Sequence, residues 1–152
     1  MRKIALIAAL LPLLLVFTAC SSEEPFTPEN IVKKGGVVSY GINEKADNLV
    51  KLIAFIDKAQ NGQKANIRIA NFWGEKTFID DVNYNGKVFK WIHRSTPSDK
   101  GKTTICKGLD VNGAGIVYLT DCNGKQKGAG VIAAQKYFYD KAVQEYKKQQ
   151  QD

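Results

Sequence analysis

The sequence predicts an α+β fold: an antiparallel sheet of four to five strands, one amphipathic helix packed on a face, and an added C-terminal helix. Three observations predict it. Residues 49–59 carry apolar side chains at helical spacing, residues 77–122 hold two pairs of strand-like segments joined by turns, and residues 131–150 are again helical in period. A chain of 152 residues is long enough for one domain with its own core.

The chain opens with the pattern of a secretory signal. Arg2 and Lys3 precede an uncharged apolar run from Ile4 to Phe17. At ~1.5 Å per residue this run reaches about 21 Å, whereas the hydrocarbon core of a bilayer measures roughly 30 Å. Its length therefore disfavours the alternative, a retained membrane helix.

The end of this segment resembles the bacterial lipobox, in which a cysteine thiol is acylated and the chain is cut before that cysteine. The small pair Thr18-Ala19 stands before Cys20, although Phe17 occupies a place where leucine is usual. The resemblance implies a signal peptide over residues 1–19 and a lipid (palmitate-type) anchor at Cys20, on the extracellular face of the cell membrane. Two acyl chains suffice for stable anchoring. The alternative is a secreted protein with an unmodified Cys20.

The charge of the chain is mildly basic. Removal of Arg2 and Lys3 with the leader lowers the net charge from +7 to +5. No stripe of Lys and Arg with interleaved aromatic residues is present, so we expect no nucleic-acid partner.

The first part of the mature chain combines a linker, a strand and a helix. Residues 20–34 contain two prolines and no apolar period, so they predict a lipidated tether. Residues 37–40 predict a short strand. A helix from Asn48 to Gln60 is expected next, with Asn43 as the N-cap before it and Asn61-Gly62 as its left-handed stop.

A strand and a hairpin follow. Residues 65–73 alternate between apolar and polar side chains, and the segments 77–84 and 87–94 flank Asn85-Gly86. Asn-Gly is the strongest signal for a two-residue hairpin turn, because both turn positions need positive φ. This turn predicts the following cross-strand pairs: Val82 with Phe89, Asp80 with Trp91, Ile79 with Ile92, Asp81 with Lys90 and Phe78 with His93.

The second hairpin, from Thr103 to Cys122, has two possible loops. A two-residue turn at Asn112-Gly113 would place Cys106 and Cys122 on opposite sides of the sheet, whereas a three-residue loop over 113–115 places them directly across from each other. We favour the second, because two cysteines in an oxidising compartment predict a disulfide, with two free buried thiols as the alternative. The α+β domain then covers residues 35–124, and residues 125–152 form a C-terminal helical extension.

The order of these parts resembles a family of small Bacillus-type lipoproteins, the domain of unknown function 4362. The matching segments are GGVVSYG, LVKLIAFIDKAQNG, ANIRIA, NYNGK and the TTIC to TDC cysteine pair. The match lies in their order, since each segment alone also follows from ordinary strand and turn chemistry. The resemblance implies extracellular anchoring and a shared domain. It brings no known activity and no catalytic residues.

Few residues suggest chemistry. His93 is the only histidine, and a general base near neutral pH would need it, although a packed histidine is the ordinary interpretation. Nothing in the sequence implies a metal or a cofactor, because one histidine and two cysteines make a poor zinc site. The aromatic residues Phe72, Trp73, Phe78, Phe89 and Trp91 predict either core or a recognition surface, with Trp73 and Trp91 the possible partner-binding residues.

We therefore expect a non-catalytic binding module for a protein, a peptide or a cell-wall component. One alternative is a cell-envelope hydrolase that uses His93 with Asp80 or Asp121. Another is an immunity or inhibitor lipoprotein that blocks an envelope-active toxin or enzyme.

Overall fold

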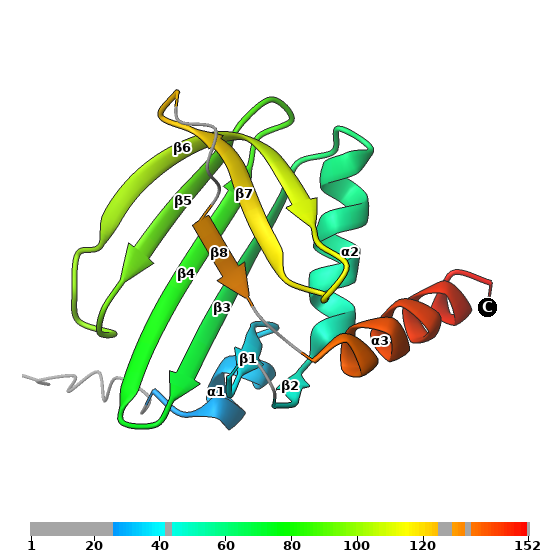
Figure 1. The fold of residues 1–152 in the computed structure, drawn as a ribbon, viewed down its shortest axis with the longest axis horizontal. Helices are drawn as coiled ribbons and strands as arrows, with labels where there is room; N and C mark the ends of the chain where they lie inside the picture. The colour runs from blue at the N-terminus through cyan, green and yellow to red at the C-terminus, as the bar shows by residue number, and fades with distance from the viewer. Residues whose placement is uncertain (1–25, 42–43, 125–128, 133–134, 152) are drawn as a thin grey trace, which may run out of the picture.

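The computed structural model describes residues 26–41, 44–124, 129–132 and 135–151. These residues form an α+β domain with three helices and one curled, mostly antiparallel sheet (Figure 1). The helices are α1 (Pro28–Lys33), α2 (Leu49–Gln60) and α3 (Lys136–Gln149). The strands are β1 (Val37–Ser39), β2 (Ala46–Asp47), β3 (Ala65–Trp73), β4 (Lys76–Tyr84), β5 (Phe89–Arg94), β6 (Lys102–Val111), β7 (Val117–Cys122) and β8 (Ala129–Ile132).

The sheet is larger than the sequence predicts. Its described part has eight strands in the order β2-β1-β3-β4-β5-β6-β7-β8, whereas we expected four to five. All neighbours are antiparallel except β1 and β3, which pair in parallel. The parallel pair arises because α2 lies between these two strands in the chain, and a helical crossover returns the chain in the same direction.

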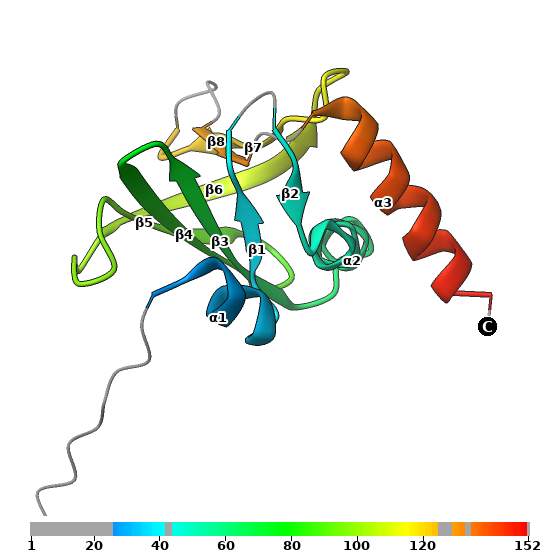
Figure 2. The ribbon, with the colours of Figure 1, turned by 90° about the horizontal axis from the view of Figure 1, so that it is seen from below.

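The two faces of the sheet carry separate cores. The inner face packs against α2 and holds the main core, which includes Ile67, Ile69, Val82 and Phe89. The outer face packs against α1 through a small cluster of Ile31, Val38 and Ala70. Figure 2 shows α1 below β1, β3 and β4, whereas the sheet curls so that its last strand, β8, lies above them. We use "inner face" and "outer face" in this sense below.

Residues 20–34 were predicted to be a tether without regular structure, but Pro28–Lys33 form helix α1. Thr27 caps the helix, because its hydroxyl accepts a hydrogen bond from the Asn30 amide at 3.3 Å. Pro28 stands in the first turn, and Ile31 is buried. Thr27-Pro28-Glu29 is a typical start of a helix. The helix was not predicted because its six residues are too few to show a helical apolar period.

Helix α2 (Leu49–Gln60) confirms the expected helix from Asn48 to Gln60 to within one residue. Gly62 follows it with φ +69°, the left-handed conformation that the stop requires. Its N-cap is Asn48, whose side-chain amide donates to the Gly36 carbonyl at 2.8 Å. The expected cap, Asn43, lies outside the described residues.

The register of the β4–β5 hairpin is two residues away from the prediction. The side chain of Asn85 accepts hydrogen bonds from the amides of Lys87 and Val88, each at 2.9 Å, and this closes a four-residue loop. Asp80 therefore pairs with His93 instead of Trp91, and Asp81 pairs with Ile92 instead of Lys90. Because the shift is even, every side chain keeps its predicted face. The predicted partners are wrong.

The β6–β7 hairpin confirms the three-residue loop. Val111 pairs with Val117, and Asn112 accepts hydrogen bonds from the amides of Ala114 and Ile116 at 3.0 Å each. Cys106 and Cys122 are directly opposed, with 4.0 Å between their Cα atoms, and form a disulfide.

The C-terminal segment is a strand followed by a helix, whereas we expected a helix from residue 131. β8 pairs with β7, and α3 begins at Lys136. α3 packs on α2: Ala142 is buried, and the Tyr146 hydroxyl donates to Asp57 at 3.0 Å.

Candidate functional site

Four aromatic rings follow one another across the inner face, at the end of the sheet near the β3–β4 turn. We call Trp73, Phe78, His93 and Trp91 the aromatic strip. The ring centres of Trp73 and Phe78 are 6.3 Å apart, those of Phe78 and His93 are 5.7 Å apart, and those of His93 and Trp91 are 5.7 Å apart. The strip is continuous because alternate residues of paired strands share a face.

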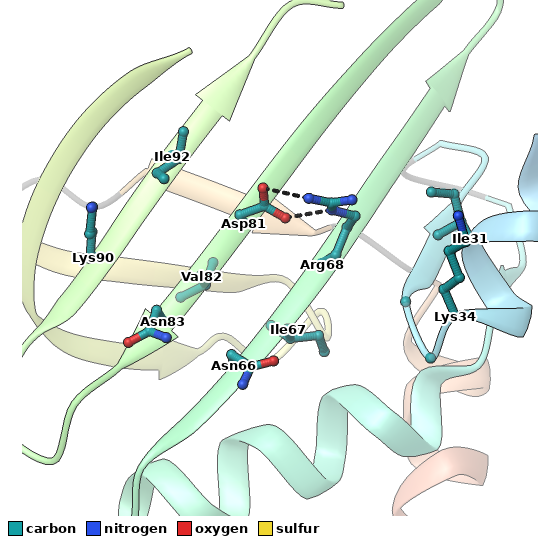
Figure 3. Close-up of a pocket in the computed structure, with 12 residues that line it drawn as sticks. Ile31, Lys34, Asn66, Ile67, Arg68, Asp81, Val82, Asn83, Lys90 and Ile92 are labelled. Atoms are coloured by element: carbon teal, nitrogen blue, oxygen red, sulfur yellow. Dashed lines mark hydrogen bonds and ion pairs between the residues drawn. The ribbon is translucent and has the colours of Figure 1, made fainter. Parts of the chain in front are cut away.

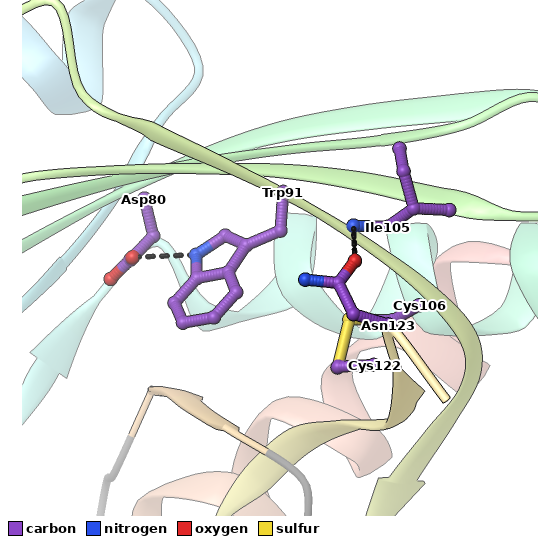
Figure 4. Close-up of a disulfide and its surroundings, with 6 residues drawn as sticks. All are labelled: Asp80, Trp91, Ile105, Cys106, Cys122 and Asn123. Carbon is purple, nitrogen blue, oxygen red and sulfur yellow. Dashed lines mark hydrogen bonds between the residues drawn. A yellow bond between two sulfur atoms is a disulfide. The ribbon is translucent and has the colours of Figure 1, made fainter. Parts of the chain in front are cut away.

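A buried carboxylate, Asp80, lies beneath the strip. The indole Nε1 of Trp91 donates to its Oδ1 at 2.7 Å, and Nδ1 of His93 lies 2.7 Å from the same oxygen. The amide of Asn71 donates to the other oxygen at 3.1 Å. Figure 4 shows the indole nitrogen of Trp91 directed at Asp80, close to the disulfide. Three neighbours thus hold the carboxylate in one orientation.

The environment of Asp80 raises the pKa of its carboxyl group. Burial is the main cause, since the residue is only 3% exposed and its charged form loses water. The hydrogen bonds of His93 and Trp91 and the charge of His93 favour the ionised form and offset part of this effect. Asp80 is therefore a structural acid that orients two members of the strip.

The strip reaches solvent at two of its members. Trp73 is 41% exposed at the end of β3, and the side chain of His93 is 38% exposed. Phe78 and Trp91 are half-buried. Because Nδ1 of His93 is engaged by Asp80, Nε2 is the ring nitrogen left for a ligand. The arrangement can hold a flat or apolar group against the rings with one polar contact beside it.

The structure divides the aromatic group that the sequence suggested. Trp73, Phe78 and Trp91 join the strip, but Phe89 belongs to the core and contacts Tyr84 and Phe55. Phe72 faces the outer side, where its ring stacks on Phe26 and Tyr40.

Of the two predicted carboxylate partners of His93, the structure brings only Asp80 to it. Asp121 instead pairs with Lys107, at 3.3 Å. The predicted two-residue turn placed Phe78 opposite His93. The four-residue loop closed by Asn85 shifts the register by two residues and places Asp80 opposite His93 instead. Cys20 lies outside the described residues.

A second candidate site lies on the outer face, beside α1 (Figure 3). This outer pocket has a volume of about 360 Å³ and is lined by residues that include Lys34, Arg68, Asp81, Lys90 and Ile92. Arg68 makes two hydrogen bonds to Asp81, at 2.6 and 3.0 Å, and Arg94 makes another. Burial alone would raise the pKa of Asp81, but the two arginines outweigh it and lower the pKa.

Within the described residues, no three carboxylate, imidazole or thiol groups gather closely enough to hold a metal ion. In the same residues, no helix has the length and apolar character needed to cross a bilayer.

Comparison with protein-family models, curated proteins and solved structures finds no match to this chain. The resemblance to the domain of unknown function 4362 stays a prediction from the quoted segments.

Proposed function

We propose that the protein is a lipoprotein anchored by Cys20 on the extracellular face of the cell membrane, where it binds a protein, a peptide or a cell-wall component without catalysis. The observation that carries the proposal is the aromatic strip: four contacting rings in which Trp73 is 41% exposed. Aromatic rings that end in solvent with a polar group beside them are typical of recognition surfaces.

The support beneath the strip favours binding. Asp80 holds Trp91 and His93 from below, so these rings are fixed before a ligand arrives. A surface that is ordered in advance loses less conformational entropy on binding. The disulfide between Cys106 and Cys122 stabilises the same side of the sheet.

A retrieval experiment tests this proposal. The purified chain is immobilised and exposed to separate extracts of cell wall and membrane, beside the variants Trp73→Ala and Tyr137→Ala. Tyr137 is the matched control, because it is an aromatic residue that is 66% exposed on α3, away from the strip. We expect Trp73→Ala to lose the retained component and Tyr137→Ala to keep it. Equal retention by both variants contradicts the assignment of the surface.

A second function, an envelope hydrolase, is favoured by one observation. Nδ1 of His93 lies 2.7 Å from a buried carboxylate, which is how an orienting acid holds a catalytic histidine. However, no hydroxyl or thiol of the described residues forms a hydrogen bond to His93, so a nucleophile would have to be water. Turnover of wall fragments or chromogenic esters that disappears in His93→Gln would replace the binding proposal with this one.

A further inference from the structure

We propose that the outer face of the sheet, around the outer pocket, docks on the anionic lipid headgroups of the bilayer that anchors the chain. This inference rests on the proposed anchor at Cys20. The evidence consists of the charge of the pocket, its position beside α1 and an exposed isoleucine at its edge.

The outer pocket is positively charged. Lys34 enters it from α1, Arg68 from β3 and Lys90 from β5, and all three residues are exposed. The one acid among its lining residues is Asp81, which two arginines already share. Since the arginines keep the pKa of Asp81 low, the acid stays ionised at neutral pH and offsets part of the charge of Arg68 and Arg94. Basic side chains at a bilayer surface are attracted by phosphatidylglycerol-type headgroups.

The pocket lies on the side of the domain that the anchor reaches first. Five residues lie between Cys20 and Phe26, the first described residue, and the six steps from one to the other span at most about 20 Å even when fully extended. Phe26 and Ile31 pack on the outer face, on the side where Figure 2 shows α1. An anchor at Cys20 therefore holds the outer face near the membrane and leaves the inner face turned away from it.

An apolar residue accompanies the charges. Ile105 is 42% exposed and lies directly across from Lys90 in the β5–β6 ladder. Its backbone is held in place by Asn123, whose amide donates to the Ile105 carbonyl at 2.9 Å and whose side chain accepts from the Ile105 amide at 3.3 Å. Exposed apolar side chains beside lysines are typical of surfaces that lie in the membrane interface.

The test measures binding of the full chain with Cys20→Ser, so that no acyl chain contributes, to sedimenting vesicles. One set of vesicles is phosphatidylcholine alone and the other contains phosphatidylglycerol. The decisive variant is Lys34→Gln with Lys90→Gln. The control is Lys51→Gln with Lys58→Gln, which removes the same charge from exposed positions on α2. Every variant keeps residues 1–19, so any binding of this segment to the vesicles is the same in all of them.

We expect the first double variant to bind phosphatidylglycerol vesicles roughly 25-fold more weakly, at about fivefold per lysine near the surface. The control should change much less, because α2 packs on the inner face and attraction to a charged surface falls off over a screening length of about 8 Å at physiological salt. Both variants replace exposed lysines, and a thermal melt checks that each is folded.

Two outcomes overturn the inference. Equal loss in both double variants would mean attraction by net charge alone. Displacement by soluble glycerol phosphate beyond the effect of sodium chloride at the same ionic strength would mean that the pocket takes a free phosphoester. The test is separate from the proposed function, since the unacylated chain reports on the outer face whether or not Cys20 is acylated and whether or not Trp73 binds a ligand.

Discussion

Asp80 and Asp81 are neighbours in the chain, yet they lie on opposite faces of the sheet and behave in opposite ways. Asp80 points inward, is 3% exposed and forms side-chain hydrogen bonds with Asn71, Trp91 and His93, and burial raises the pKa of its carboxyl group. Asp81 points outward and is bound by two arginines, which lower its pKa.

This difference shows what each face is suited to do. On the inner face the carboxylate of Asp80 binds Trp91 and His93 and so fixes the positions of two aromatic rings. On the outer face a carboxylate holds two arginines at a partly exposed surface lined by further basic residues, where we propose an anionic partner. The following experiments test or sharpen this contrast.

The largest effect should come from the disulfide, which closes the inner face. The double variant Cys106→Ala with Cys122→Ala should lower the free energy of unfolding by about 3 kcal/mol, the value expected for a cross-link of this loop length. Urea denaturation of the oxidised wild type and the variant measures it. Vesicle binding by the outer face should persist wherever the variant is folded. A change below about 1 kcal/mol contradicts a stabilising role for the link.

The next effect compares the two acids directly. Asp80→Ala should lower the free energy of unfolding by about 2–3 kcal/mol, because it leaves the indole of Trp91 and the amide of Asn71 without this acceptor in a buried place. Asp81→Ala should cost less, about 1 kcal/mol, because water can hydrate Arg68, whose side chain is 51% exposed, although Arg94, whose side chain is 19% exposed, also loses this partner.

Asp80→Asn is the control for this comparison, since it keeps an acceptor for Trp91. It should cost less than Asp80→Ala. Equal losses in Asp80→Ala and Asp81→Ala, measured by the same denaturation, contradict the contrast between the faces.

The smallest effect is a difference in pH dependence. The folded pKa of Asp80 is raised above the ordinary value of 3.8, so the folded state loses stability as the pH rises from that value through the raised pKa. Over this window Asp80→Asn, which cannot ionise, should gain stability relative to wild type.

Asp81 should show the reverse sign. Its folded pKa is lowered, so its stabilising effect is present above 3.8 and is lost as the pH falls through the folded value. The deficit of Asp81→Asn should shrink on acidification. Denaturation curves recorded on both sides of pH 3.8 give both slopes, and slopes of the same sign are inconsistent with the assigned environments.

The sequence predicted the parts that local chemistry determines. The β6–β7 register followed from the Gly113–Gly115 loop and the cysteine pair, and the end of α2 followed from Gly62. The β4–β5 register did not follow from Asn-Gly alone, because the side chain of Asn85 closes a longer loop that only the folded hairpin reveals.

The loop at Asn85 also explains why the sequence predicted the face of each aromatic residue but not its partner. A shift of two residues preserves faces, so Phe78, Trp91 and His93 were correctly expected on one aromatic face. It changes partners, so the sequence could not choose between Asp80 and Asp121 for His93. The small strands β2 and β8 and helix α1 are too short for periodicity to detect, and tertiary contacts stabilise them.

The central claim is that the two faces of this sheet have separate partners, the membrane outside and a ligand inside. Vesicle binding of Trp73→Ala beside Lys34→Gln with Lys90→Gln tests it most directly, because an exposed tryptophan is the natural competitor for insertion into a bilayer interface. The account predicts that Trp73→Ala binds phosphatidylglycerol vesicles like the parent chain and that the lysine variant does not. Loss of binding in Trp73→Ala with normal binding in the lysine variant would contradict it.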